Sequence, residues 1–439
     1  MHDRKGWATN RVRNLIVDHA SGPSPTCEER NIADDEEWGL LKTTAVTWNG
    51  WDATAHKVPP KHFWGNRKIE VQVGDVLVTK AGPRNRCGVV VYIPDTPPRL
   101  MVSGKMILLR PDRSRVDPVF LASTLATEEI QRFLDSRTTG LADAQLNFTN
   151  QLLLDTEIEF PALLEQCRIA ALRLALDEAI EQTEALIAKT QQIKAGLMHD
   201  LFTRGVTKNG ELRPPRNEAA QLYKESPLGW IPKEWDFQCL SELTTRIVDG
   251  VHHTPTYVEH GVPFVTVKNL TASRTIDFSD LNYVSHQDHQ KFLRRADPKP
   301  GDILVTKDGT LGISRLVEQW HPEFSIFVSV AMLRPIAARI RPQMLHLFFD
   351  CGSYERQLGR LSAGTGLKHI HLEHFRQFVI PLPAGEEQDW IWAVAEAKEN
   401  RLLAEQLQLS KLRDLKRGLM HDLLTGRVRV PINASSTPA

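Results

Sequence analysis

The chain has 439 residues, of which 41% are hydrophobic and 25% charged, and its 54 Lys and Arg balance 54 Asp and Glu to a formal net charge of +0. Its apolar content excludes a disordered protein, and its length predicts about two to four domains. Zero net charge argues against binding nucleic acid without sequence preference, which needs a basic surplus. No apolar run reaches the roughly 18 residues that span a bilayer, and the five cysteines lie far apart. We therefore expect a reduced, cytoplasmic protein with no membrane partner.

The first predicted domain covers residues 1–158 and is a mixed α/β unit. Runs of β-branched residues broken by glycine and charged residues, as in residues 71–91, are typical of a strand, a turn and a second strand. Residues 117–136 have a helical pattern. We expect one folded domain here.

A spacer helix segment is predicted over residues 159–204, with the helical pattern running from 162 to 203. Its apolar and small residues recur at alternating spacings of four and three, which is the seam of a coiled coil. Pro161 precedes the helix and Gly205 follows it, as is typical of a helix start and a left-handed helix end. The predicted seam comprises Leu172, Leu176, Ala179, Thr183, Leu186, Thr190, Ile193 and Leu197.

The same order of elements follows in the second half of the chain. A linker rich in proline and charge spans residues 205–229, a second α/β domain spans 230–382, and a second long helix spans 383–425 before a flexible tail at 426–439. Residues 262–267 are a predicted strand and residues 342–360 are predicted helical. The second helix has the poorer seam, because it is interrupted by Lys398, Arg401, Glu405 and Gln408. A helix of about 40 residues is about 60 Å long, so each helix is expected to pair with the other.

An internal duplication accounts for this order. Residues 194–203 (KAGLMHDLFT) match residues 416–425 (KRGLMHDLLT) 222 positions later, and residues 74–80 (GDVLVTK) match residues 301–307 (GDILVTK) at an offset of 227. Ile16-Val17-Asp18 resembles Ile247-Val248-Asp249 at an offset of 231. Because the matches are colinear, we predict two like units related by pseudo-two-fold symmetry. Their ligand is then two copies of one molecule, or one long molecule with two similar ends.

Catalytic motifs are absent from the sequence. There is no phosphate-binding G-x-x-x-x-G-K-[ST] loop, no G-x-S-x-G elbow and no H-E-x-x-H helix. Asp302 and Lys307 fall on opposite faces of a strand, which does not suit a metal-dependent nuclease. His199-Asp200 and His421-Asp422 recur near the helix ends, and we interpret them as end contacts. We predict no catalytic residue and no metal site.

Polar and basic loops in both domains suit contact with DNA bases. Arg and Lys bind guanine edges, Asn and Gln bind adenine, and acids bind cytosine in the major groove. The candidates in the first domain are Lys42, Thr43, Trp48, Asn49, Lys80, Arg84, Asn85 and Arg86. Those in the second domain are His252, His253, Lys268, Asn269, Lys307, Asp308, Thr310, Thr365, Lys368 and His369.

The two helix endings, together with residues 228–235 (LGWIPKEW) and 301–307, resemble the specificity subunits of Type I restriction–modification systems. The similarity covers essentially the whole chain. One departure is that the first domain has no clear counterpart of the W-I-P-x-x-W opening; another is His199 and His421, where many relatives have Gln. The resemblance implies an α+β fold, in which two pseudo-symmetric target-recognition domains are separated by two long antiparallel helices forming a coiled coil.

The resemblance also implies a non-catalytic subunit of a larger complex. It would recognise a bipartite, asymmetric double-stranded DNA target, one half-site per recognition domain. Two modification subunits would dock on the helices and supply S-adenosylmethionine-dependent methylation, and restriction subunits would supply ATP- and Mg²⁺-dependent translocation and cleavage; no cofactor would bind this chain. The candidate docking residues are Leu186, Ile193, Leu197, Met198, Leu201, Leu412, Leu415, Leu419, Met420 and Leu423.

Two alternatives differ from this hypothesis. A stand-alone methyltransferase would need an N-P-P-F-type motif and a glycine-rich cofactor loop, and the sequence has neither. A coiled-coil scaffold without DNA specificity would have no reason to carry two α/β domains with polar loops.

Overall fold

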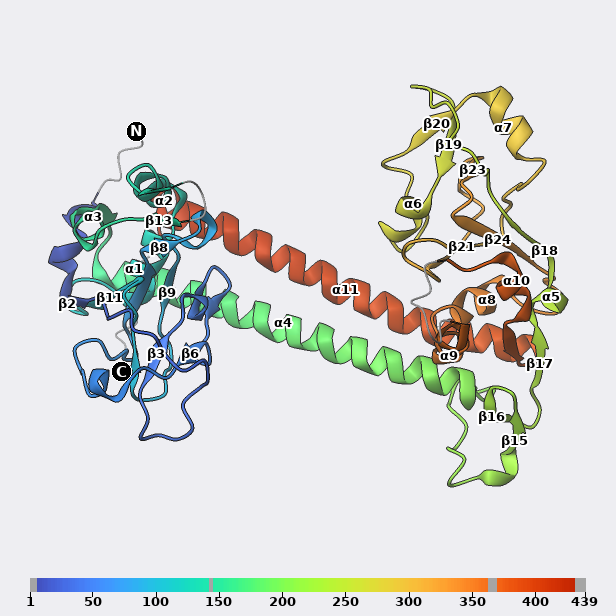
Figure 1. Cartoon of the computed structure of the whole chain (residues 1–439), viewed down its shortest axis with the longest axis horizontal. Helices are drawn as coiled ribbons and strands as arrows, with labels where there is room; N and C mark the ends of the chain where they lie inside the picture. The colour runs from blue at the N-terminus through green and yellow to red at the C-terminus, as the bar shows by residue number, and fades with distance from the viewer. Residues whose placement is uncertain (1–5, 142–144, 362–368, 431–439) are drawn as a thin grey trace. The chain divides into compact units, whose positions relative to one another are not determined.

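The computed structural model describes residues 6–141, 145–361 and 369–430. The chain divides into two compact units (Figure 1). Unit 1 comprises Met1–Thr183 and Gln408–Ala439, and unit 2 comprises Glu184–Leu407. Each unit therefore contains one α/β domain together with one part of each long helix.

The central sheet of unit 1 has four antiparallel strands in the order β2-β11-β7-β9. These strands are β2 (Ile16–Ala20), β11 (Met106–Pro111), β7 (Val76–Thr79) and β9 (Val90–Tyr92). Both faces are apolar: Val76 and Val78 pack into one core, whereas Leu77 packs into the other. This alternation follows from the two-residue period of a strand, and it explains why the strands are continuous apolar runs.

Unit 2 repeats this sheet. Its strands β18 (Thr244–Asp249), β24 (Val330–Pro335), β21 (Ile303–Thr306) and β22 (Ser314–Leu316) pair antiparallel in the order β18-β24-β21-β22. Ile303 and Val305 face one core and Leu304 the other, as their counterparts do in unit 1. The predicted internal duplication and the α+β fold class are confirmed.

The ladder register corrects one of the sequence matches. Leu108 pairs with Leu77 on one side and Ala20 on the other, and Met332 pairs in the same way with Leu304 and Val248. Ala20 therefore corresponds to Val248, 228 positions later, and the predicted offset of 231 for Ile16-Val17-Asp18 is wrong by three residues. Both edge strands also have an irregularity, which leaves Val17 in one unit and Thr245 in the other without a ladder partner.

The same offset of 228 identifies a counterpart, in the first domain, of one residue of the W-I-P-x-x-W opening. β1 (Ala8–Arg11) pairs with β14 (Glu157–Phe160), and β17 (Asp236–Cys239) pairs with β25 (Val379–Leu382). A tryptophan precedes each of the two leading strands, Trp7 in unit 1 and Trp235 in unit 2. Trp7 packs edge-on against Phe120 with 6.3 Å between the ring centroids. It is the counterpart of Trp235, which ends the W-I-P-x-x-W opening of the second domain.

Smaller elements complete each unit. Those of unit 1 are β3 (Gly39–Leu41), β4 (Val46–Thr47), β5 (Gly50–Trp51), β6 (His56–Lys57), β8 (Ala81–Gly82), β10 (Leu100–Met101), β12 (Thr139–Leu141), β13 (Gln145–Asn147), α1 (Pro118–Leu125), α2 (Glu128–Asp135), α3 (Asn150–Asp155) and the 3-10 turns η1 (Val12–Leu15), η2 (Thr43–Ala45), η3 (Lys61–Phe63) and η4 (Arg84–Arg86). Those of unit 2 are η5 (Ala220–Leu222), β15 (Tyr223–Ser226), β16 (Gly229–Pro232), β19 (Val262–Val265), β20 (Asn282–Val284), β23 (Ser325–Ile326), α5 (Leu240–Leu243), α6 (Val267–Thr271), α7 (His286–Phe292), α8 (Pro342–Phe348), α9 (Gly352–Leu361) and α10 (Leu372–Gln377).

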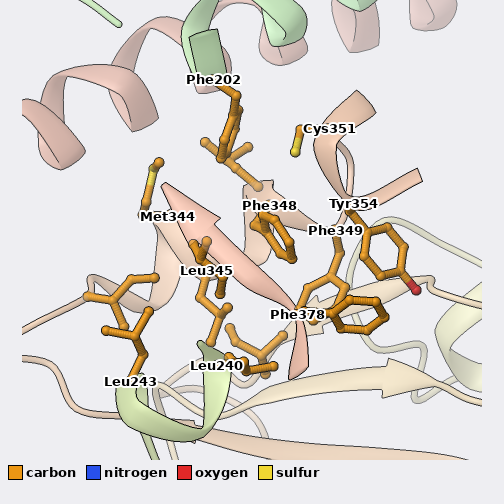
Figure 2. Close-up of a cluster of buried hydrophobic side chains, with 14 of the residues drawn as sticks. Phe202, Leu240, Leu243, Met344, Leu345, Phe348, Phe349, Cys351, Tyr354 and Phe378 are labelled. Atoms are coloured by element: carbon orange, nitrogen blue, oxygen red, sulfur yellow. The ribbon is translucent and has the colours of Figure 1, made fainter. Parts of the chain in front are cut away.

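The largest core of unit 2 is rich in aromatic residues. Figure 2 shows Phe348, Phe349, Tyr354 and Phe378 packed together, with edge-to-face ring contacts at centroid distances of 5.0–5.8 Å among them. Phe202, from the end of the first long helix, is buried in the same cluster. This part of the helix is therefore held to unit 2 by apolar burial.

The long helices are α4 (Leu163–Thr203) and α11 (Gly385–Leu424). The first turns of both are anchored alike by a buried glutamine. Gln166 accepts a hydrogen bond from the Asp117 backbone N–H and donates to the carbonyls of Arg115 and Pro161. Gln388 makes the corresponding bonds to Arg341, Arg339 and Pro383 at 2.7, 3.2 and 2.9 Å. At the other ends, Gly205 and Gly426 adopt positive φ values of 64° and 70°, as predicted for left-handed caps.

Within each unit the two helices run antiparallel and side by side. In unit 1, Asp177 of α4 forms an ion pair with Lys416 of α11. In unit 2, Lys194 of α4 lies 2.5 Å from Glu399 of α11, and Glu405 is buried. Glu405, which was predicted to interrupt the apolar seam of the second helix, is therefore buried within the structure.

Three of the eight predicted α4 seam residues, Leu172, Leu186 and Ile193, are exposed. Thr183 and Thr190 are buried as predicted, whereas Leu186 and Ile193 are 40% and 46% exposed. Ile187 is buried instead. Leu186 and Ile187 are both apolar, and either of them satisfies the alternating spacing of four and three residues. Spacing alone therefore does not determine which of the two faces the partner helix.

Candidate nucleic-acid interface

The lysines that end the two central strands occupy equivalent positions. The carbonyl of Lys80, just after β7, accepts a hydrogen bond from the Phe148 backbone N–H at 3.0 Å. The carbonyl of Lys307, just after β21, accepts one from the Ile370 N–H at 2.8 Å. Each unit thus brings together the end of its central strand, the segment before a short helix (α3 or α10) and the end of its edge strand.

In unit 1 these segments form a cluster of neutral polar groups around one ammonium. Lys80 Nζ donates to Asn150 Oδ1 at 2.9 Å and to Ser21 Oγ at 3.2 Å, and Asn150 Nδ2 lies 3.0 Å from Ser21 Oγ. Burial lowers the pKa of Lys80 below its ordinary value. Amide and hydroxyl groups of this kind both donate and accept hydrogen bonds.

In unit 2 the corresponding cluster is charged. Lys307 Nζ lies 3.3 Å from Asp249 Oδ2 and 3.5 Å from His369 Nε2, and only 4% of the Lys307 side chain is exposed. Asp308 contacts both Lys307 and His369. By the ladder register, Asp249 is the counterpart of Ser21, so a carboxylate here replaces the hydroxyl of unit 1.

Asp249 also joins two further groups to this cluster. Its Oδ1 accepts from Arg295 and lies 3.1 Å from His252 Nε2. Burial opposes ionisation of Asp249, but the hydrogen bonds from Arg295 and His252 and the charge of Lys307 outweigh it, so the pKa of Asp249 is lowered. The carboxylate is thus ionised and fixed by several donors.

The predicted residues of unit 1 are only partly brought together. Lys80 belongs to the cluster described above, whereas the others lie on separate loops. Lys42 and Thr43 lie at η2, where Lys42 Nζ is 3.0 Å from Glu29, and Trp48 and Asn49 are exposed in the turn between β4 and β5. Arg84, Asn85 and Arg86 form η4, where Arg84 Nη1 donates to Asp135 at 2.6 Å.

Four predicted residues of unit 2 lie together: His252, Lys307, Asp308 and His369. His253 packs edge-on against Phe292, Lys268 is ion-paired with Asp280, and Thr310 is exposed. Thr365 and Lys368 lie outside the described residues.

Asn269 has a structural role in unit 2. It caps α6 with Thr266 and donates to the carbonyls of Asp277 and Asp280, and it is 3% exposed. Its polar atoms are used inside the fold, so we leave it out of the interface proposed below.

Sequence reasoning missed Ser21, Asn150, Asp249 and Arg295. A duplication aligned at the offset of 228 would have indicated Ser21 and Asp249, because both then lie at the end of the edge strand: Ser21 directly follows β2 and Asp249 is the last residue of β18. Asn150 and Arg295 have no counterpart that a repeat could reveal, and only the folded chain brings them to the two lysines.

The candidate docking residues divide by burial. Leu186, Ile193 and Leu415 are exposed, and Leu197, Leu412 and Leu419 are half-buried. Met198, Leu201, Met420 and Leu423 are instead buried in the cores of their own units, which corrects the list of residues that a partner can reach.

Among the described residues, no group of three or more His, Cys, Asp or Glu side chains is placed to hold a metal ion. A search of the described helices for one apolar and long enough to cross a bilayer found no candidate.

Two alike α/β frames with unlike polar clusters, each packed on parts of two helices of 41 and 40 residues, define a class of internally duplicated α/β proteins. No family model matches the chain. Curated relatives are the specificity subunits of the Type I restriction enzymes EcoEI from Escherichia coli, 27% identical over 192 residues, and MjaVIII from Methanocaldococcus jannaschii, 23% identical over 339 residues. These matches cover 44% and 75% of this chain, but 32% of the EcoEI subunit and 75% of the MjaVIII subunit.

Solved structures have the same fold. One chain, from a structure described as showing complex assembly and conformational transition of the type I R-M system, is 19% identical with a TM-score of 0.56 and covers 96% of this chain and 98% of that one. The S subunit from M. genitalium is 16% identical with a TM-score of 0.54, covering 96% of this chain and 97% of that one. The recognition made from the sequence is therefore confirmed: the chain is similar to the specificity subunits of Type I restriction systems.

Proposed function

We propose that this chain is the DNA sequence-recognition subunit of a Type I restriction–modification complex. The observation that carries the proposal is the pair of clusters around Lys80 and Lys307. They occupy equivalent places in two duplicated frames but differ in chemistry, one neutral and one charged. Because donors and acceptors at base edges differ between base pairs, unlike clusters suit two unlike half-sites.

A bipartite target is the kind of ligand that a duplicated chain fits. Exposed predicted residues of the two domains, among them Asn85, His253 and Thr310, would contact bases or phosphates. The half-buried Lys80 and the buried Lys307 would position their neighbours and would not contact DNA directly. The relatives named as specificity subunits support this assignment.

The helices would serve as the spacer between the half-sites. Helices of 41 and 40 residues are each about 60 Å long if straight, and their buried polar seam positions favour a single register. A fixed register would give a fixed gap in the target.

Chemistry would be supplied by other subunits of the complex. In this proposal two modification subunits dock on the helices and methylate DNA, while restriction subunits translocate and cleave it. S-adenosylmethionine, ATP and Mg²⁺ would bind those partners. With a formal net charge of +0, this chain would rely on its partners for much of the phosphate neutralisation.

A domain exchange tests the proposal. Methylation-sensitive sequencing of host DNA would first identify the target. Residues 1–155 would then be replaced by the corresponding domain of a relative, and target binding of the assembled complex would be measured by filter binding. We expect only one half-site to change. A change in both half-sites, or no sequence preference in the unaltered complex, would contradict the proposal and favour a scaffold without DNA specificity.

A further inference from the structure

The cluster of unit 2 contains a histidine that bridges two of its charged groups. His369 contacts Asp308 through Nδ1, and its Nε2 lies 3.5 Å from Lys307 Nζ. The His369 side chain is 35% exposed, whereas that of Lys307 is 4% exposed. In unit 1 the described side-chain partners of Lys80 are a hydroxyl and an amide, neither of which titrates. The two clusters therefore differ in how they can respond to pH.

The two neighbours of His369 define its protonation state. A carboxylate only accepts hydrogen bonds, and an ammonium only donates them. Nδ1 must therefore carry the proton toward Asp308, and Nε2 must be the bare acceptor toward Lys307. This arrangement is the neutral imidazole with its proton on Nδ1. An imidazolium would instead point an N–H at the Lys307 ammonium, and the two positive groups would repel each other.

The charges of the cluster balance while its histidines are neutral. Lys307 Nζ lies 3.3 Å from Asp249 Oδ2 and 3.9 Å from Asp308 Oδ2, and Arg295 contacts the other oxygen of Asp249. Two cations thus face two carboxylates, and a proton on His369 adds a third positive charge that competes with Lys307 for Asp308. The described charged or titratable groups around the ring are Lys307 and Asp308 after β21, Asp249 at the end of β18 with its partners His252 and Arg295, and His371, Glu373, His374 and Arg376 of α10 and its N-cap.

Two further histidines form a row with His369 at the start of α10. The ring centroids of His369 and His371 lie 4.5 Å apart, and those of His371 and His374 lie 5.3 Å apart. His374 Nδ1 accepts the backbone N–H of His371 at 3.3 Å, so this ring also has a bare nitrogen. Burial and the charges of the other two rings lower the pKa of His374, although Glu373 opposes them. Acid would therefore place like charges along one row beside the cluster.

We infer that His369 is a positioning residue for the half-site recognised by unit 2, and that its protonation weakens selectivity for that half-site alone. The neutral ring holds Asp308 and Lys307 in one arrangement and so fixes which hydrogen-bonding groups around them face the target. The protonated ring repels Lys307 and adds a charge that attracts any phosphate, whatever the sequence. This inference rests on the proposed function, of which it specifies the regulation of one recognition site.

Filter binding with the assembled complex at pH 8 and pH 5.5 tests the inference, because histidine changes its charge within this range. The half-site that the exchange of residues 1–155 leaves unchanged is the one assigned to unit 2. Selectivity is the affinity for the full target divided by the affinity for a target mutated in one half-site. At pH 5.5 it should fall about tenfold or more for the half-site of unit 2, which is the effect of losing one hydrogen bond to a charged group. For the half-site of unit 1 it should change less than about twofold.

His369→Gln replaces the ring by a group that does not titrate. Its amide donates and accepts hydrogen bonds, as the neutral imidazole does. This variant should keep the wild-type selectivity at pH 8 within about threefold and lose the pH dependence, whereas His369→Ala should lose selectivity for the half-site of unit 2 at both pH values. His260→Gln, at an exposed histidine outside the cluster, is the matched control and should keep the wild-type pH dependence.

Selectivity for the half-site of unit 1 shows whether each variant is folded and assembled. If wild-type selectivity for the half-site of unit 2 is the same at both pH values, or if His369→Gln retains the pH dependence, His369 does not position the cluster, although the proposed function stands. An equal fall at both half-sites would also overturn the inference, because the titrating group would then not belong to one cluster. If the complex has no sequence preference at pH 8, the proposed function itself fails, and the inference fails with it.

Discussion

Replacing Gln388 by leucine should release the start of α11 from unit 2. Gln388 is 2% exposed, and its amide makes three hydrogen bonds, to the Arg341 N–H and to the carbonyls of Arg339 and Pro383. Leucine has a similar volume but leaves these backbone groups without their partner. A buried unsatisfied group costs about 1–3 kcal/mol, so the three together should cost about 2–4 kcal/mol of local stability after partial access of water.

Hydrogen exchange measures this loss without requiring the whole chain to unfold in one step. A loss of about 2–4 kcal/mol corresponds to a roughly 30- to 1,000-fold faster exchange of the amides in α8 and the first turns of α11. Gln166→Leu should have the same effect on α1 and the start of α4 in unit 1, because its three bonds are equivalent. The two sites thus replicate the experiment within one chain.

Gln408→Leu provides the control, since Gln408 is an exposed residue of the same helix. It should change exchange by less than about threefold, as surface substitutions usually do. If Gln388→Leu changes exchange no more than Gln408→Leu, the glutamine does not anchor the helix and the reasoning is refuted.

Three further predictions concern pH, recognition and spacing. Burial, opposed by the Gln72 N–H and by Arg110, raises the pKa of Asp75 to about 6. The contribution of Asp75 to the stability of unit 1 should therefore be largest below about pH 4 and should fall by up to about 3 kcal/mol as the pH rises through 6. Asp75→Asn should remove this component of the pH dependence of thermal unfolding between pH 4 and 7, and an unchanged pH dependence would assign it to another group. Lys80→Met should weaken recognition of one half-site several-fold, and Lys307→Met should weaken recognition of the other half-site several-fold. Filter binding at constant salt, with targets mutated in one half-site at a time, measures both effects. If either substitution weakened recognition of both half-sites, the two clusters would not act separately. Seven residues inserted into each long helix, after Thr190 and at the facing position of α11, preserve the seam of the coiled coil. The insertion should lengthen the gap that the protein tolerates between the two DNA half-sites by about 10 Å, or roughly three base pairs. An unchanged gap would exclude the spacer role.

Much of this fold was predictable because it depends on local periodicity and on repetition. The long helices, their glycine caps and the strand–turn–strand units of the central sheets follow from patterns over a few residues, and the duplication follows from the colinear matches. Predictions over residues 362–368 and 431–439, including most of the flexible tail, lie outside the described residues.

Tertiary structure decided what depends on pairing between distant segments. A four-and-three pattern is satisfied by Leu186 as well as by Ile187, and only packing against α11 in the folded chain buries the second and exposes the first. Likewise, a match of three residues at the edge strand cannot fix its register, whereas the ladder to β11 or β24 does, because each backbone hydrogen bond specifies one partner. That register is what makes Ser21 and Asp249 counterparts and brings them to Lys80 and Lys307.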